Sequence, residues 1–155
     1  MIKRVIAVGS PHGDDQIAWR VLEALESCVE NRLGIELWVR DRPGLSLLND
    51  FDPAIPTLLV DAADFGGRVG ETLLYQHPHK MEPGQAGQLS GHGIGVQSLL
   101  DLAQSLGYSL PPLDILAIQI KTVSPMAPMS AELQQRLPDL VATLRSCLTP
   151  SSQHI

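Results

Sequence analysis

Apolar residues along the chain recur with two spacings, that of buried strands and that of amphipathic helices. Residues 3–9 form a near-continuous apolar run, as in a parallel strand buried on both faces. Over residues 17–28 the apolar positions recur every three or four residues until Gly34 ends the pattern. The chain is therefore expected to open with a strand followed by a helix.

The same alternation continues to the C-terminus. Further strands are predicted at residues 35–39, 57–60, 71–75 and 113–120, and helices at 45–48, 96–106 and after Ser130, the last kinked or restarted by Pro138. Residues 76–90 are polar, rich in Gly and Pro, and predicted to be a mobile loop. We expect an α/β protein, a three-layer α/β/α sandwich with a mostly parallel twisted sheet of about five strands.

Size and charge narrow the possible functions. The 155 residues, 44% of them hydrophobic, suffice for one domain, expected over residues 1–150 with a flexible tail at 151–155. Lys and Arg number 11 against 17 Asp and Glu, a net charge of −6, and no basic stripe follows the chain. Neither nucleic acid nor a membrane is an expected partner, and we expect a cytoplasmic protein.

An acidic pair occupies an unusual position after the first strand. Asp14 and Asp15 follow the turn at residues 9–13, where a helix is about to begin. Phosphate-binding α/β proteins keep this helix N-terminus free of anions. The two acids either cap the helix or face the crevice and bind a cation.

Two more polar residues are expected at the same edge of the sheet. Asp61 ends the third predicted strand, and His92 opens the helix after the polar loop. If the first and third strands are neighbours, Asp15 and Asp61 can approach one point and, with His92, form a partial shell for a divalent transition metal. Each also has a structural reading, Asp61 as a turn cap and His92 as a residue satisfied by the backbone.

Other candidate ligands are weaker. His77 and His79 lie in the polar loop without a partner at metal-site spacing. Met126 and Met129 are read as gap-filling side chains. Cys28 and Cys147 fall on the apolar sides of predicted helices and are expected to be structural thiols; no disulfide framework is indicated.

The chain carries four notable segments in order: Val5 to Asp15, Asp41 to Leu48, Val60 to Gly66, and Ser90 to Gly95; the order continues through Ala117 to Gln119 and Met129 to Ser130. In this order the segments resemble the hydrogenase maturation proteases. The resemblance covers nearly the whole chain. Departures are Ser10, where the family usually has Asn, a turn one residue shorter, and Gln16 and Ala18 in place of Gly.

The resemblance implies an endopeptidase that removes the C-terminal extension of a nickel-iron hydrogenase large-subunit precursor after nickel insertion. It implies that Asp15, Asp61 and His92 recognise nickel supplied by the precursor, a site that zinc or cadmium could occupy in vitro. Asp14, or an Asp15 released from the metal, would serve as general base. A monomer is expected.

Two other classes stay open at this stage. One is a non-proteolytic, nickel-sensing maturation chaperone on the same fold. The other is a different α/β enzyme, such as a nucleoside phosphorylase or a peptidyl-tRNA hydrolase, which the lack of a phosphate-cradling glycine loop disfavours. No Ser-His-Asp or Cys-His arrangement can be assembled, so metal-assisted hydrolysis remains the expected chemistry of a protease.

Overall fold

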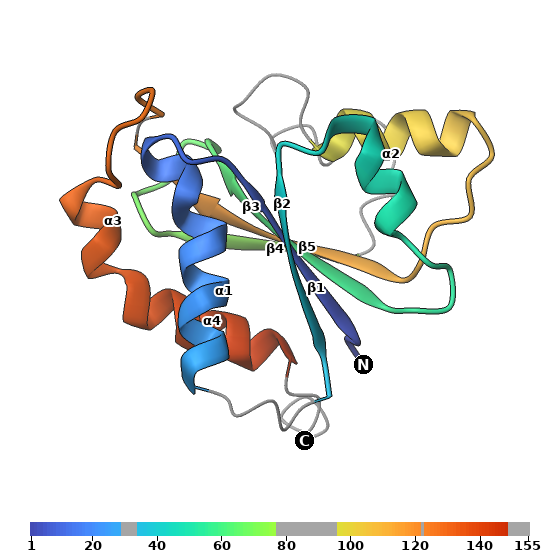
Figure 1. Ribbon diagram of the computed structural model, residues 1–155, viewed down its shortest axis with the longest axis horizontal. Coiled ribbons are helices and arrows are strands. Elements are labelled where there is room, and N and C mark those ends of the chain that lie inside the picture. Colours follow the sequence, from blue (N-terminus) through green and yellow to red (C-terminus); the bar gives the residue numbers. More distant parts are fainter. Residues whose placement is uncertain (29–33, 77–95, 122, 149–155) are drawn as a thin grey trace.

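A five-stranded sheet with helices on both faces forms the body of the protein (Figure 1). The computed structural model describes residues 1–28, 34–76, 96–121 and 123–148. The strands are β1 (Arg4–Gly9), β2 (Glu36–Asp41), β3 (Thr57–Ala63), β4 (Thr72–Gln76) and β5 (Leu113–Gln119). The α-helices are α1 (Ile17–Cys28), α2 (Val96–Ser105), α3 (Ala131–Gln135) and α4 (Leu137–Leu148), and two 3-10 helices are η1 (Gly13–Gln16) and η2 (Gly44–Asp50). The expected three-layer α/β/α architecture is confirmed.

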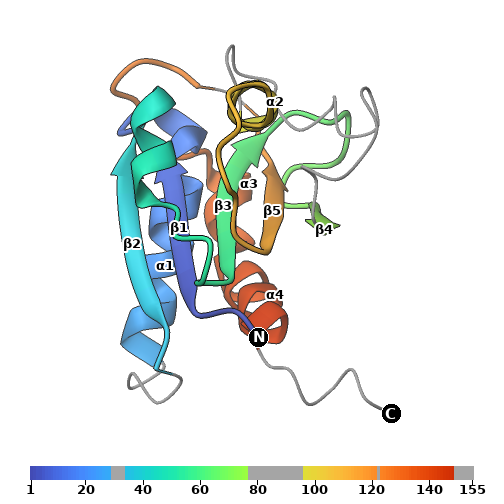
Figure 2. The same ribbon diagram turned by 90° about the vertical axis from the view of Figure 1, so that its right-hand side faces the viewer.

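The strand order is β2-β1-β3-β5-β4, and only β4 runs antiparallel to its neighbour. The first and third strands are therefore adjacent, as the proposed meeting of Asp15 and Asp61 requires. Their register pairs Val8 with Asp61. Figure 2 shows the parallel strands ending together on one edge of the sheet, which is where α/β proteins bind their ligands.

Each face of the sheet carries its own apolar core. Val5 and Ala7 of β1 face α1 and α4, whereas Ile6 faces α2 and η2 on the other side (Figure 1). All three are fully buried. Burying an Ile or Val side chain contributes about 1.5–3 kcal/mol, so a strand that is apolar on both faces is fixed between the two layers.

Most predicted elements are confirmed, with shifts at their ends. The strand predicted to end at Asp61 continues to Ala63, because Ala62 and Ala63 still pair with β5. The predicted helix cap is confirmed, since Ser130 Oγ accepts a hydrogen bond from the N–H of Leu133. The helix restarts at Leu137, just before Pro138.

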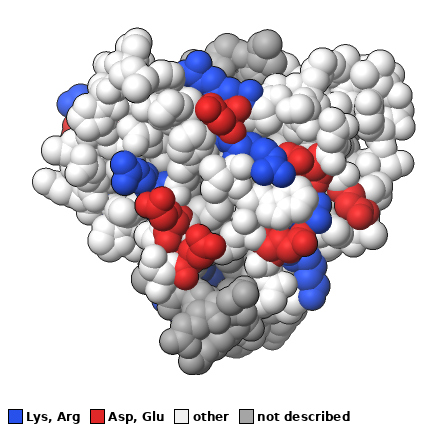
Figure 3. All heavy atoms as spheres, viewed as in Figure 1, with Lys and Arg blue, Asp and Glu red and all other residues white. Residues whose placement is uncertain are grey.

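Some predictions lie outside the described residues. They include the mobile loop beyond Gln76 and the tail at 151–155. Cys147 is a free, partly buried thiol packed against the core, as predicted, whereas the side chain of Cys28 is not described. No helix in the described part of the chain is long and apolar enough to span a membrane. On the face drawn in Figure 3, acidic and basic side chains are interspersed.

Gln119 holds the turn that follows β3, a few residues after Asp61. The side chain is 4% exposed at the end of β5. Its Oε1 accepts hydrogen bonds from the N–H groups of Phe65 and Gly67, at 2.9 and 3.0 Å. Its Nε2 donates to Asp64 Oδ1 and to the carbonyl of Ile120. One buried amide oxygen is thus the acceptor for two N–H groups of this turn.

We predict that Gln119→Met lowers the free energy of unfolding by about 2–3 kcal/mol, because the substitution keeps the length of the side chain but removes the acceptor of two N–H groups. Urea denaturation followed by circular dichroism measures the loss. Gln135→Met, at an exposed position of α3, is the control and should change stability by less than about 0.5 kcal/mol. Equal stability of the two variants would contradict the role given to Gln119.

Candidate active site

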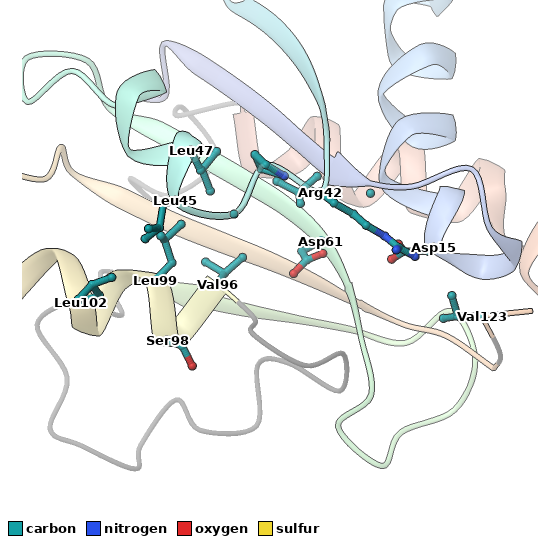
Figure 4. A pocket seen from close by; sticks show the side chains of 14 residues that line it. Asp15, Arg42, Leu45, Leu47, Asp61, Val96, Ser98, Leu99, Leu102 and Val123 are labelled. Atoms are coloured by element: carbon teal, nitrogen blue, oxygen red, sulfur yellow. The ribbon is translucent and has the colours of Figure 1, made fainter. Parts of the chain in front are cut away.

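One pocket of about 760 Å³ lies where β1 and β3 end, between η2 and α2 (Figure 4). Most of its lining is aliphatic, and two carboxylates stand at one side of it. The lining residues are Val8, Gly9, Asp15, Arg42, Pro43, Gly44, Leu45, Leu47, Asp61, Val96, Ser98, Leu99, Leu102 and Val123. Pockets of this size and polarity are typical of ligand sites.

The turn between β1 and η1 places Asp15 at the pocket. Ser10 N–H donates to the carbonyl of Asp15 at 3.2 Å, and Ser10 Oγ donates to Asp15 Oδ2 at 2.5 Å. A Cβ atom at Gly9 would lie 2.5 Å from that same Asp15 carbonyl oxygen, so the turn can close only with glycine there. Asp15 is 8% exposed. The Ser10 departure from the family pattern thus supplies a hydrogen bond to the expected metal ligand.

Asp61 reaches the pocket from inside a strand. Along β3, Leu59, Asp61 and Ala63 alternate onto the face that α2 and η2 cover, and Leu59 and Ala63 belong to the apolar core there. Asp61 therefore brings a carboxylate into an otherwise apolar layer. Figure 4 shows its side chain directed into the pocket, on the same side as Asp15.

This environment raises the pKa of Asp61 to about 8. Desolvation by burial is the largest cause, and the negative charge of Asp15 is the second; a hydrogen bond from the backbone of Ala62 acts in the opposite direction. Strongly perturbed carboxyls in a pocket are frequent at functional sites. A cation held between Asp15 and Asp61 would replace their mutual repulsion by two attractions.

Asp14 faces a different part of the protein. Its side chain is fully buried, and it is not among the residues that line the pocket. Its Oδ1 accepts from the N–H of Ser130 at 2.7 Å, and its Oδ2 accepts from Lys121 N–H and Ser130 Oγ at 2.9 and 3.1 Å. These contacts favour a structural role, tying η1 to the segment between β5 and α3, over the expected role of general base.

The third predicted ligand is not described. His92 lies in the undescribed segment before α2, as do His77 and His79. Among the residues that the structure describes, no three His, Cys, Asp or Glu side chains are grouped as a metal site. Of the two methionines interpreted as gap-filling side chains, Met129 is buried in the core and Met126 is exposed.

Sequence reasoning missed Arg42 and the aliphatic side of the pocket. Arg42 directly follows β2, and its guanidinium extends toward Asp15 (Figure 4). Leu45 and Leu102 are 62% and 38% exposed, an unusual state for leucines on helices facing each other. The available signal for Arg42 was a cation shortly after the second predicted strand.

Solved structures that resemble this fold include hydrogenase maturation endopeptidases and proteases. The chain superposes on the maturating endopeptidase HybD from E. coli with a TM-score of 0.71 and 18% identity, covering 96% of this chain and 92% of that one. The maturation protease HycI from Thermococcus kodakarensis gives 0.61 and 21%, covering 94% and 92%. The endopeptidase HycI from Escherichia coli gives 0.61 and 23%, covering 96% and 89%.

The chain has the fold of the hydrogenase maturation endopeptidases. The likeness extends over almost the entire length of both partners in each comparison. No protein-family model and no curated protein sequence matches the chain. At these identities the comparisons establish the fold that the sequence resemblance implied.

We predict that Asp14→Ala lowers the free energy of unfolding by about 2–4 kcal/mol, because three donors lose their buried acceptor. Asp14→Asn keeps one acceptor oxygen and should lose roughly half as much. Thermal and urea denaturation measure both. An Asp14→Ala variant as stable as the wild type would show that the contacts to Lys121 and Ser130 do not hold the fold.

Asp61 should make the protein less stable as pH rises. Between the ordinary carboxyl pKa of 3.8 and about 8, the folded state keeps the Asp61 proton that the unfolded chain has lost. The folded state then binds more protons, so the free energy of unfolding falls with increasing pH across this window. Asp61→Asn removes this titration.

The stability of Asp61→Asn relative to wild type should therefore increase from pH 4 to pH 8, by roughly 1.4 kcal/mol per pH unit over most of this range. Urea denaturation across this pH range measures it. Asp139→Asn is the control, because it removes an exposed carboxylate from α4 on the opposite face of the sheet. A stability difference for Asp61→Asn that does not change with pH would contradict the raised pKa.

Proposed function

We propose that this protein is an endopeptidase that removes the C-terminal extension of a nickel-iron hydrogenase large-subunit precursor after nickel insertion. The observation that supports this most is that two carboxylates, Asp15 and Asp61, line one apolar pocket at the carboxyl ends of the adjacent strands β1 and β3. The shared fold with solved maturation endopeptidases supports it independently. The names of those proteins give a role in hydrogenase maturation, and we extend this role to the present protein as part of the proposal.

The pocket suits an extended peptide segment. Leu45, Leu99 and Leu102 form its aliphatic side, and Asp15 and Asp61 stand at its other side. A segment that carries a metal-bound residue next to an apolar side chain could place the metal at the acids and the apolar group between η2 and α2. Concave, mostly apolar sites with a few polar groups fix orientation in this way.

The donor set fits a metal delivered by the substrate. Asp15 and Asp61 offer carboxylate oxygens, and we assign the third ligand position to His92. Two carboxylates and one imidazole leave coordination positions open, whereas structural zinc sites are usually closed by four protein ligands. We therefore expect free metal to bind weakly and the precursor to supply the nickel, with zinc or cadmium as substitutes in vitro.

The residues have separate tasks in this proposal. Asp15, oriented by Ser10, and Asp61 hold the metal-bearing segment so that one peptide bond lies beside them. A metal held there can polarise a carbonyl group or lower the pKa of a bound water to about 7. Asp14 positions η1 and therefore Asp15. We further propose that the protein acts as a cytoplasmic monomer on this one precursor.

Incubation with a nickel-loaded precursor tests the proposal directly. Mass spectrometry should show loss of the C-terminal extension with wild-type protein and no loss with a nickel-free precursor. Asp15→Ala, Asp61→Ala and His92→Ala should each lower the cleavage rate at least about 100-fold, as expected for residues that position the reacting group. Asp139→Ala, on the opposite face of the sheet, should cut at the wild-type rate.

Three outcomes would count against parts of the proposal. Binding of the loaded precursor without any mass loss would indicate a nickel-sensing chaperone instead of a protease. Cleavage of a nickel-free precursor, or permanent loss of activity after brief chelation of the protein, would indicate a metallopeptidase with its own metal. Wild-type rates in Asp61→Ala or His92→Ala would remove those residues from the site.

A further inference from the structure

Arg42 is a cation at the edge of the carboxylate pair. Its Nε lies 4.0 Å from Asp15 Oδ2, and its Nη2 donates to Ser10 Oγ at 3.3 Å. Ser10 Oγ in turn donates to the same Asp15 Oδ2. The arginine side chain is 60% exposed, whereas that of Asp15 is 11% exposed. An exposed guanidinium therefore lies next to one oxygen of a mostly buried carboxylate.

The backbone fixes where this arginine starts. Arg42 has a φ of +40°, a value that non-glycine residues rarely adopt, and Pro43 follows it. Its N–H donates to the carbonyl of Gly9 at 2.9 Å, which ties the end of β2 to the turn that carries Asp15. A side chain held at a costly backbone conformation beside a pocket is a candidate functional feature.

The contacts of the guanidinium itself are weak. A separation of 4.0 Å is the outer limit of an ion pair, and 3.3 Å is a long hydrogen bond. Arg40 shows the contrast two residues earlier, since its Nε lies 2.7 Å from Asp50 Oδ2 and its Nη2 donates to Asp50 Oδ1. A pair with this long separation and an exposed guanidinium contributes little stability and can open readily.

We propose that Arg42 is a positioning residue that occupies the cation side of Asp15, weakens the binding of free divalent ions there, and withdraws when the metal-bearing segment of the precursor docks. The inference rests on the proposed function. A positive charge next to Asp15 offsets part of its attraction for a dication, and the ion competes with the guanidinium for the Asp15 carboxylate. A metal that arrives on a peptide brings additional apolar contacts to the pocket, which a free ion lacks.

Arg42 thereby discriminates between free metal ions and metal ions held by a docked peptide. Free ions in solution meet a site that is already partly neutralised. A docked segment gains the aliphatic contacts of Leu45, Leu99 and Leu102 and can displace the loosely held guanidinium. Arg42 thus favours metal held in a peptide over metal alone, a discrimination that two carboxylates by themselves do not provide.

Calorimetric titration of the purified protein with Ni²⁺ tests this without a precursor. Arg42→Gln should lower the Kd for Ni²⁺ about three- to tenfold, because it removes a repulsive charge a few ångströms from the ion. Arg42→Lys keeps the charge and should stay within about twofold of wild type. Arg20→Gln, an exposed arginine on α1 that bonds Gln16, removes the same charge away from the pocket and should leave the Kd unchanged.

Unchanged or weaker Ni²⁺ binding in Arg42→Gln would overturn the inference, as would equal tightening in Arg20→Gln, which would reflect net charge alone. Absence of Ni²⁺ binding to every variant would overturn it as well. A parallel processing assay separates the two proposals. If the wild type cuts the loaded precursor while Arg42→Gln leaves the Kd unchanged, only the role of Arg42 fails. If Arg42→Gln binds Ni²⁺ more tightly, free Zn²⁺ should also inhibit its processing at lower concentration than wild type.

Discussion

The parallel pairing of β1 with β3 is the constraint on which the candidate site depends. It sets Val8 opposite Asp61, and the turn after β1 then brings Asp15 to the same pocket. Parallel strands end on a common edge, and the helices that connect them leave a crevice there. A shift of one residue in this register would send Asp61 to the opposite face, into the core beneath α1. Asp15 and Asp61 would then no longer share a pocket, and they could not bind one metal ion together.

Asp14 and Asp61 illustrate how environment gives different roles to chemically identical side chains. Asp14 is fully buried but accepts three hydrogen bonds, from backbone N–H groups and a hydroxyl of the segment before α3. Asp61 lies in an apolar layer and is influenced by the charge of Asp15, so its ionised form is disfavoured. These hydrogen bonds give Asp14 a structural role. The unfavourable environment of an ionised Asp61 favours the binding of a cation there.

Sequence reasoning predicted the sheet and, on the condition that the first and third strands are neighbours, the approach of Asp15 to Asp61, because apolar periodicity follows from local spacing and strand order from short connections. It placed Asp61 at the end of a strand, whereas the pairing with β5 carries the strand two residues further. It treated Asp14 as a possible base, since no local pattern reveals that Ser130 and Lys121 reach it from more than a hundred residues away. His92 lies outside the described residues and keeps the status of a prediction.

The sequence by itself determined the α/β class and the acidic character of the sheet edge at which the candidate site lies. These depend on hydrophobic spacing and on which residues follow each strand. Only the tertiary structure decided which carboxylates share a pocket, that Gln119 holds the chain leaving β3, and that Arg42 meets Asp15 through Ser10. Such contacts join residues distant in sequence, and their geometry arises when strands are aligned and side chains are packed, which no local pattern encodes.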